Sequence, residues 1–202
     1  VDGGYALMDS KRIHLHRNQV WEAIDFGILL NMTKDSLVEF NRVEQIVNRS
    51  ENQVQGQEGK GIFVYGARDN TIIHNHFAHN DIGFYMAMGG EGNHVYGNQF
   101  IDNFSQVKYV GDALLEWSHA GRGNYWSGYL GWDHNLDGVG NTAYQPNDKI
   151  DKLFWLYPEA NFLMGSPIVV VLRWVQRQFE ITAPSGIVDS YPLLEMNPAF
   201  SF

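Results

Sequence analysis

Histidine and methionine side chains gather in one stretch of the chain, where they could together bind a metal ion. The chain has 8 His, 6 Met and no Cys. Imidazole and thioether groups are the copper ligands that remain when no thiolate is present, and thioethers favour Cu(I) in particular. We interpret the densest group as a candidate copper site formed by His74, His76, His79, Met86, Met88 and His94. Histidines scattered over the surface without a metal are the alternative.

A second stretch has the spacing of a calcium-binding loop. Its oxygen donors alternate as in an EF-hand loop, with Gly138 at the sharp turn. The predicted ligands are the side chains of Asp133, Asn135, Asp137 and Asn141 and the carbonyl group of Val139. Tyr144 stands where an EF-hand has its bidentate Glu, so a calcium-free loop held by Asx turns is the alternative.

The composition excludes several classes of protein. Lys and Arg number 14 against 23 Asp and Glu, and the net charge of −9 has the wrong sign for binding a phosphate backbone. No apolar run approaches the roughly 20 residues that cross a bilayer. The absence of cysteine excludes disulfides and thiolate metal sites. A chain of 202 residues can nevertheless bury a sizeable core.

The elements that must position these side chains are repeats. A Gly followed by apolar residues and a later Asn recurs four times, as Gly4 with Asn18, Gly27 with Asn41, Gly61 with Asn75, and Gly83 with Asn98. Successive asparagines are 23, 34 and 23 residues apart, which predicts an insertion in one repeat at about residues 48–58. The Leu-rich consensus of leucine-rich repeats is missing. We therefore predict an all-β fold, a parallel β-helix, with coils over residues 1–116.

Columns of equivalent residues separate the predicted core from the predicted surface, because stacked strands give equivalent residues the same environment. Apolar columns are predicted to point inward, and the asparagines to form an amide ladder. The position two residues after the Gly is also apolar, although alternation points it outward. This stripe, Leu29, Phe63 and Tyr85, predicts a partner-binding surface or a surface covered by the insertion or a cap.

The two candidate methionines fall in different columns. Met86 aligns with Leu30 and Val64, which predicts a place in the core. Met88 aligns with Met32 and Gly66 in a column that is not apolar, which predicts a more accessible thioether.

The candidate histidines also differ in their predicted environment. His76 and His79 lie in polar columns and are predicted to be accessible to solvent. The column of His74 does not predict whether its side chain is accessible. His94 shares its column with His14, but three strand spacings place them roughly 14 Å apart, too far to share one ion.

The C-terminal region, residues 117–202, is predicted to close the solenoid. It is rich in Trp and Tyr, and the last coil of a solenoid needs a cap over its open core. Ser166 and Pro167 then start a predicted helix over about residues 167–180. Its apolar face consists of Ile168, Val171, Leu172, Val175 and Phe179. This face is predicted to pack on its own domain, with docking to a partner or a membrane surface as alternatives.

An enzyme is the second functional hypothesis, because many parallel β-helices cleave or epimerise acidic polysaccharides as lyases, hydrolases or epimerases. Such sites need carboxylates stacked on adjacent coils, and the columns contain no such cluster. Nucleophile and nucleotide-binding motifs are also absent. We therefore predict a protein that is not an enzyme, and a structural interaction module without metal is the third hypothesis.

Three segments resemble the NosD family of nitrous oxide reductase maturation proteins. They are GIFVYGARDNTIIHNHFAHN, which starts at Gly61, NYWSGYLGWDHNLDGVGNTAY, which starts at Asn124, and LFWLYPEANFLMGSP, which starts at Leu153. The last of these is more specific than the repeats. Members of the family are usually about twice as long and begin with a signal peptide, so we interpret the chain as a C-terminal fragment.

The resemblance implies that the parallel β-helix is right-handed, and it also implies function, location and partners. It implies a periplasmic protein that handles copper for the catalytic cluster of nitrous oxide reductase. The implied partners are the ABC transporter subunits NosF and NosY, a copper donor lipoprotein and nitrous oxide reductase itself, with no nucleic acid and with membrane contact only through partners. Copper, as Cu(I), and a possible calcium ion are the expected metals.

Overall fold

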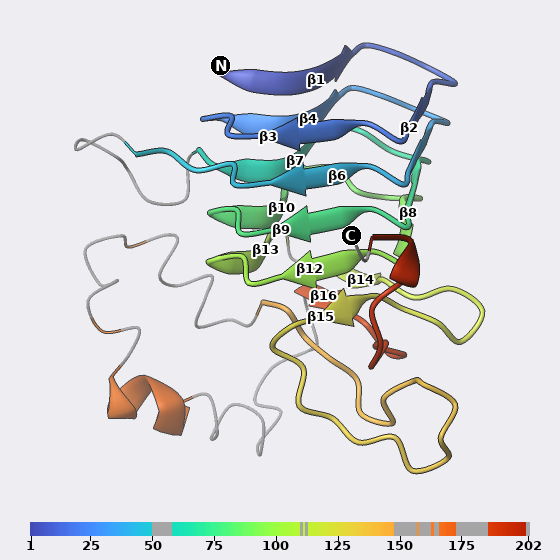
Figure 1. Cartoon of the computed structure of the whole chain (residues 1–202), viewed down its shortest axis with the longest axis vertical. Coiled ribbons are helices and arrows are strands. Elements are labelled where there is room, and N and C mark those ends of the chain that lie inside the picture. The colour runs from blue at the N-terminus through green and yellow to red at the C-terminus, as the bar shows by residue number, and fades with distance from the viewer. Residues whose placement is uncertain are drawn as a thin grey trace.

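The computed structural model describes residues 1–49, 58–109, 111, 113–147, 157, 163, 166–172 and 186–200. Three parallel sheets wrap around one core and form a right-handed parallel β-helix, as predicted (Figure 1). Each of the first four coils contributes one strand to each sheet, and the coils stack from the N-terminal end at the top of Figure 1 downward.

The strands are grouped by sheet. The first sheet contains β1 (Gly3–Met8), β4 (Phe26–Asn31), β7 (Lys60–Tyr65), β10 (Ile82–Met88) and β13 (Ser105–Tyr109). The second contains β2 (His14–His16), β5 (Leu37–Glu39), β8 (Thr71–Ile73) and β11 (His94–Tyr96). The third contains β3 (Gln19–Trp21), β6 (Arg42–Glu44), β9 (His76–Ala78), β12 (Gln99–Ile101) and β15 (Tyr125–Trp126).

The repeat columns predict the core correctly. Leu7, Leu30, Val64 and Met86 are paired in register along the first sheet, and all four are buried. In the third sheet, Phe77 and Phe100 stack with ring centroids 5.4 Å apart. Because inward side chains alternate with outward ones, the same register leaves the residues between them on the outer surface.

The asparagine ladder runs down the corner between the second and third sheets. It consists of Asn18, Asn41, Asn75, Asn98 and Asn124. Each of the first four donates from its backbone N–H and from Nδ2 to Oδ1 of the next, over 2.9–3.1 Å. The predicted ladder is thus confirmed, and all of its bonds point in one direction along the solenoid.

Asp189 receives the last bonds of this ladder. It lies directly after β16 (Gly186–Val188), which pairs with β14 (Leu114–Glu116). Its Oδ2 accepts from the Asn124 backbone N–H over 2.7 Å and from Trp126 Nε1 over 2.8 Å. A Cβ at position 123 would overlap this carboxylate, so Gly123 is required there. A segment remote in sequence therefore closes the ladder.

Aromatic rings fill the lower end of the core, as expected for a cap. Trp126 stacks on Phe100 with centroids 4.4 Å apart, and Trp117 lies 4.6 Å from Phe84. Both tryptophans are buried. The cap is completed by a 3-10 helix, η2 (Pro198–Phe200), which lies against the outside of the third sheet. The boundary between coils and cap near residue 116 stays a prediction.

Two predicted segments are described only in part. Residues 50–57 of the insertion lie outside the described residues. The helix is described over residues 167–172, and Val175 and Phe179 lie outside the described part. Ile168, Val171 and Leu172 are exposed, at 61%, 57% and 50%, whereas Val169 is buried. Within the described residues, no helix is long and apolar enough to cross a membrane.

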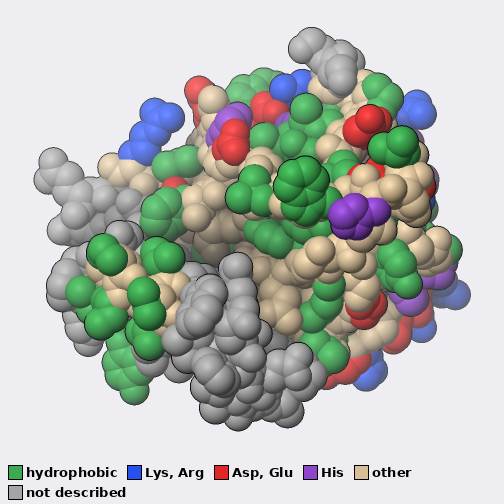
Figure 2. Space-filling model, turned by 90° about the horizontal axis from the view of Figure 1, so that it is seen from below, with side chains coloured by type: hydrophobic (Ala, Val, Ile, Leu, Met, Phe, Trp, Pro, Cys, Tyr) green, Lys and Arg blue, Asp and Glu red, His purple; other side chains and the backbone are tan. Residues whose placement is uncertain are grey.

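Apolar side chains are exposed at the end of the solenoid opposite to β1. Figure 2 looks onto this end from below. The helix of residues 167–172 and the long loop after β15 both lie at this end (Figure 1). The exposed apolar residues of the loop are Leu130, Trp132 and Leu136.

Candidate functional site

Five of the eight histidines lie on or beside the outer face of the second sheet. We call this set the histidine face: His14, His16, His74, His94 and His119. The columns of the sheet explain it. Leu15, Val38, Ile72 and Val95 occupy the central, inward column, so the residues on either side of each point outward.

Ring contacts connect members of the histidine face. His14 and His16 stack with centroids 4.3 Å apart. His94 and His119 meet edge to face at 5.9 Å, and Tyr96 stacks on His119 at 5.0 Å. The predicted shared column of His14 and His94 is confirmed by the register, with Leu37 and Thr71 between them.

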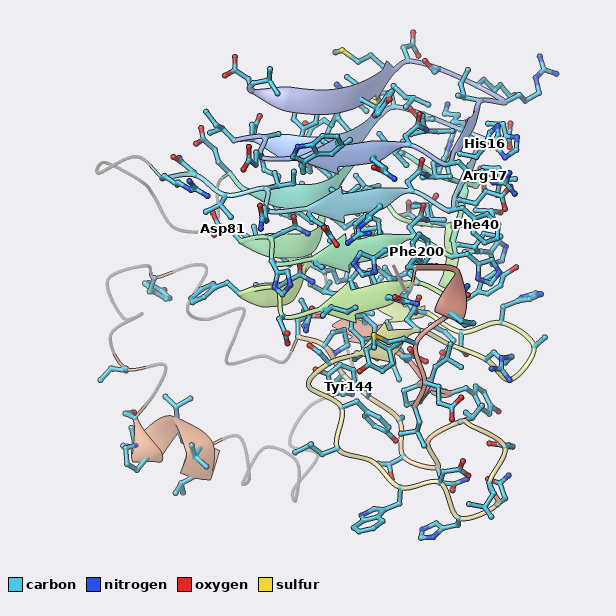
Figure 3. The ribbon with its side chains drawn as sticks, in the orientation of Figure 1. His16, Arg17, Phe40, Asp81, Tyr144 and Phe200 are labelled. Atoms are coloured by element: carbon cyan, nitrogen blue, oxygen red, sulfur yellow. The ribbon has the colours of Figure 1, made fainter. Side chains whose placement is uncertain are left out.

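His74 stands at a corner of the coil. The equivalent residues of four coils all have a positive φ here. They are Arg17 at 54°, Phe40 at 54°, His74 at 51° and Gly97 at 68°. This conformation turns the chain from the second sheet into the third. His74 stacks on Phe40 with ring centroids 5.3 Å apart. His16, Arg17 and Phe40 lie along the same edge of the solenoid (Figure 3).

The predicted copper ligands are spread over three faces. His74 and His94 belong to the histidine face, while His76 and His79 lie on and directly after β9 of the third sheet. Met86 is buried in the core, in agreement with its column. Among the described residues, no group of three or more His, Asp or Glu side chains is arranged to hold a metal ion. Whether any of these side chains binds copper stays a prediction.

Met88 is displaced by a β-bulge. The register of β10 against β7 shifts between Met86 and Met88, so Met88 pairs with Tyr65. The column alignment instead equated Met88 with Gly66, which is wrong by one position. The thioether is nevertheless accessible, because Met88 is 50% exposed.

His76 is buried, although its column predicted an accessible side chain. Its Nε2 lies 2.8 Å from Oε1 of Glu44, and its Nδ1 lies 3.0 Å from Oε1 of Gln99. Gln99 donates from Nε2 to the carbonyl of Asn197 over 2.9 Å, which fixes the orientation of its amide. Phe200 covers the imidazole at 5.4 Å. The C-terminal segment, which the repeats do not predict, is what buries it.

Glu44 is held in its charged form at this position. Burial raises its pKa, but the hydrogen bond and charge of Arg42, together with His76, outweigh burial and lower the pKa below its ordinary value. Arg42 Nε lies 2.9 Å from the carboxylate. Glu44 Oε1 and Gln99 Oε1 lie against the two ring nitrogens of His76, so a metal ion could reach neither nitrogen without displacing one of these side chains.

The predicted calcium loop is closed by its own hydrogen bonds. Asp133 accepts from the backbone N–H of Gly138 over 2.9 Å, and Asp137 accepts from that of Val139 over 2.8 Å. Asn141 Oδ1 accepts from the N–H of His134, and Asn135 Nδ2 donates to Asp137. Calcium binding here stays a prediction, and a calcium-dependent rise in unfolding temperature is the measurement that checks it.

The stripe of Leu29, Phe63 and Tyr85 is half-buried and carries cations. Phe63 and Tyr85 stack at 5.0 Å. Lys60 Nζ lies 4.8 Å from the centre of the Phe63 ring, and Lys108 Nζ lies 4.7 Å from that of Tyr85. Burial, and then the charge of Lys60, lower the pKa of Lys108. The role of this stripe in binding a partner stays a prediction.

Three residues of the face were not among the predicted ligands: His14, His16 and His119. The signal for the first two is present in the sequence, because two histidines flank an apolar residue in a repeat and therefore point to the same side of a strand. His119 lies beyond the repeats, so no column could align it with His94.

Comparison with known proteins identifies the family. Residues 1–131 match the family described as periplasmic copper-binding protein (NosD). The chain is 44% identical over 195 residues to a protein of Stutzerimonas stutzeri named probable ABC transporter binding protein NosD, and covers 45% of it. It is 44% identical over 192 residues to a protein of the same name from Pseudomonas aeruginosa, again covering 45%.

The extent of these matches determines what they show. They include 95% and 94% of this chain, but the chain spans about half the length of the two relatives. Both relatives are named as binding proteins. The family match covers well over half of the chain, and the chain belongs to the NosD family of periplasmic copper-binding proteins.

Proposed function

We propose that the chain handles copper in the periplasm and delivers it for assembly of the nitrous oxide reductase copper cluster. The family description supports copper and the periplasm. The observation that carries the proposal is the histidine face, where His14 contacts His16 and His94 contacts His119. The proposal includes no catalytic step.

The arrangement of the face suits transfer better than storage. Imidazole binds copper well, and exposed imidazoles in pairs leave room for a ligand supplied by another protein. A closed set of ligands would instead retain the ion, as structural metal sites do. Met88 and His74 are further proposed ligands, because both are accessible at least in part.

Copper binding by the face is tested with an anaerobic Cu(I) titration of the chain against a competing chelator. A variant lacking all five imidazoles of the face is expected to bind at least about tenfold more weakly. His74 is replaced by Asn, which tolerates its positive φ, and the other four by Ala. The matched control is His134→Ala, which removes an exposed histidine that is not among the predicted ligands. No binding by the original chain, or equal binding by the five-histidine variant, contradicts the proposal.

We propose that the lower end of the solenoid docks on the ABC transporter formed by NosF and NosY. The names of the two relatives support an association with such a transporter. Ile168, Val171 and Leu172 are exposed there, together with Trp132 of the long loop. A group of exposed apolar side chains such as this one is typical of a protein interface.

Docking is tested by co-purification of the chain with NosF and NosY. Ile168→Glu with Val171→Glu is expected to reduce the recovered complex at least about tenfold, because buried carboxylates would face an apolar interface. Met8→Glu with Trp21→Glu, at exposed positions of the first coil, is the matched control. Equal loss in both variants would assign docking to another surface.

A further inference from the structure

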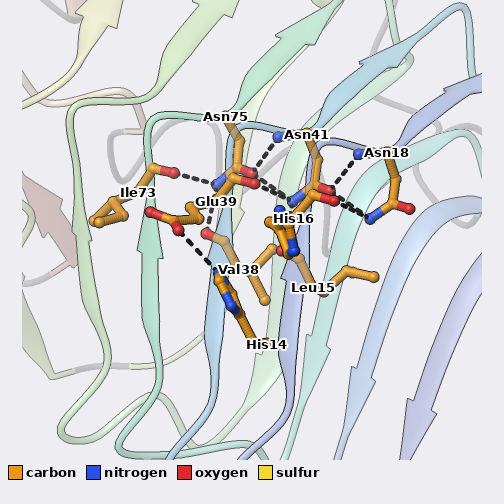
Figure 4. A network of polar contacts seen from close by, with 9 residues as sticks. All are labelled: His14, Leu15, His16, Asn18, Val38, Glu39, Asn41, Ile73 and Asn75. Carbon is orange, nitrogen blue, oxygen red and sulfur yellow. Dashed lines mark hydrogen bonds and ion pairs between the residues drawn. The ribbon is translucent and has the colours of Figure 1, made fainter.

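The upper end of the histidine face carries a distinct arrangement of two imidazoles and one carboxylate. His14 and His16 lie on β2, and Glu39 lies on the neighbouring β5, paired with His16 in the register. The two rings stack at 4.3 Å with an angle of 23° between their planes. Figure 4 shows the three side chains together.

Glu39 selects the tautomer of the neutral His14 ring. Its Oε1 lies 2.9 Å from His14 Nε2, so in the neutral imidazole Nε2 carries the hydrogen and donates it. The lone pair is then on Nδ1. A carboxylate that accepts from the second nitrogen of a histidine is the usual outer partner of a metal ligand, because it orients the ring and raises its basicity.

The asparagine ladder holds the backbone of both strands. Asn41 donates from Nδ2 to the carbonyls of Leu15 and Glu39, each over 3.0 Å, and so ties the histidine strand to the glutamate strand (Figure 4). Asn18 donates to the carbonyl of His16 over 3.0 Å. The backbones are therefore fixed before any ion arrives, and Glu39 holds the ring of His14, while the exposed ring of His16 can turn about its side-chain torsions.

We infer that His14 and His16 form a binding site for one copper ion, with Glu39 as the residue that positions His14. The ion is bound by Nδ1 of His14 and by a nitrogen of His16, which a side-chain rotation brings beside it. The carboxylate of Glu39, only 20% exposed, offsets part of the charge of the ion. Arg17 follows His16 directly and opposes a cation, which favours the singly charged Cu(I).

The site of His14 and His16 is separate from the candidate copper ligands between residues 74 and 94. The register places three strand spacings, roughly 14 Å, between His14 and His94. Both cannot bind the same ion, so the upper site and the pair His94–His119 are separate positions on one face. The inference rests on the proposed copper function, and its experiment separates the two.

The test is an anaerobic Cu(I) titration of the 202-residue chain, its His14→Ala/His16→Ala variant and a matched His134→Ala control. The double variant is expected to lose one equivalent of copper, and the control none. Modification of histidines by diethylpyrocarbonate, located by mass spectrometry, gives a second readout: copper should protect His14 and His16 in the original chain. Glu39→Gln is expected to weaken this site about tenfold without removing it.

The outcomes distinguish the two proposals. Copper binding with unchanged stoichiometry in the double variant, and no protection of His14 and His16, overturns this site and leaves copper handling intact. Absence of copper binding by the original chain overturns both. Because both imidazoles are exposed, the unfolding temperature of the double variant is expected to equal that of the original chain, which excludes misfolding as the cause of a loss.

Discussion

Replacing Asn75 by Ala is expected to lower the free energy of unfolding by about 4 kcal/mol. Asn75 is fully buried, and its Oδ1 accepts both the N–H and the Nδ2 of Asn41. Its own Nδ2 donates to the carbonyls of Val38 and Ile73 and to Asn98. The substitution leaves several buried groups without a partner, each costing about 1–3 kcal/mol before partial relaxation.

Urea unfolding followed by tryptophan fluorescence measures this effect, and Asn18→Ala is the matched control. Asn18 is the first member of the ladder and is only partly buried. Water can therefore replace its bonds, and the expected loss is below about 1 kcal/mol. Equal losses at the two positions would show that the ladder does not stabilise the solenoid through its buried bonds.

Replacing Asp189 by Ala is expected to lower the free energy of unfolding by about 3 kcal/mol. The carboxylate is fully buried and accepts from the backbone of Asn124 and Tyr191 and from the indole of Trp126. Without it, buried N–H groups of the last coil lose their acceptor. The same substitution should detach the segment after β16, which protease digestion would detect as new cleavage after residue 186.

Asp189 also predicts how stability depends on pH. Burial raises its pKa to about 6, although the hydrogen bonds from Asn124, Trp126 and Tyr191 oppose this. A carboxyl group whose pKa is raised in the folded state adds stability below its unfolded pKa and loses it as pH rises through the folded pKa. Its contribution is therefore expected to fall by about 1.4 kcal/mol between pH 5 and pH 7.5.

The pH effect is measured as a difference between the original chain and Asp189→Asn, which cannot titrate. Glu44 contributes with the opposite sign, because its pKa is lowered, and the difference removes its contribution. Urea midpoints at pH 5 and pH 7.5 are compared for both chains. The same slope in both chains would show that Asp189 does not titrate in this range.

The repeats predict most of the solenoid because equivalent residues of successive coils have the same environment. That is why the inward column through Val64 and the ladder through Asn75 follow from spacing alone. The bulge before Met88 is not predicted in this way, because it shifts the register within one strand. Equivalence between coils cannot reveal a local irregularity.

The remaining differences come from contacts that join distant parts of the chain. Asp189 is 65 residues from Asn124, and Gln99 is 98 residues from Asn197. No periodicity connects them, so neither the closure of the ladder nor the burial of His76 could be predicted. The density of His and Met in the sequence predicts metal ligands between residues 74 and 94. The second sheet instead brings together histidines from β2, β11 and the turn after β14.

The carboxylate of Asp189 ends the series of hydrogen bonds in the asparagine ladder. Every asparagine between Asn18 and Asp189 in the ladder accepts from one coil and donates to the next, so it passes the pattern on. An ionised carboxylate can only accept. Coils can therefore be duplicated or deleted among the interior repeats without changing the terminus, whereas Asp189→Asn would place an Nδ2 donor at a fully buried position that now holds only an acceptor.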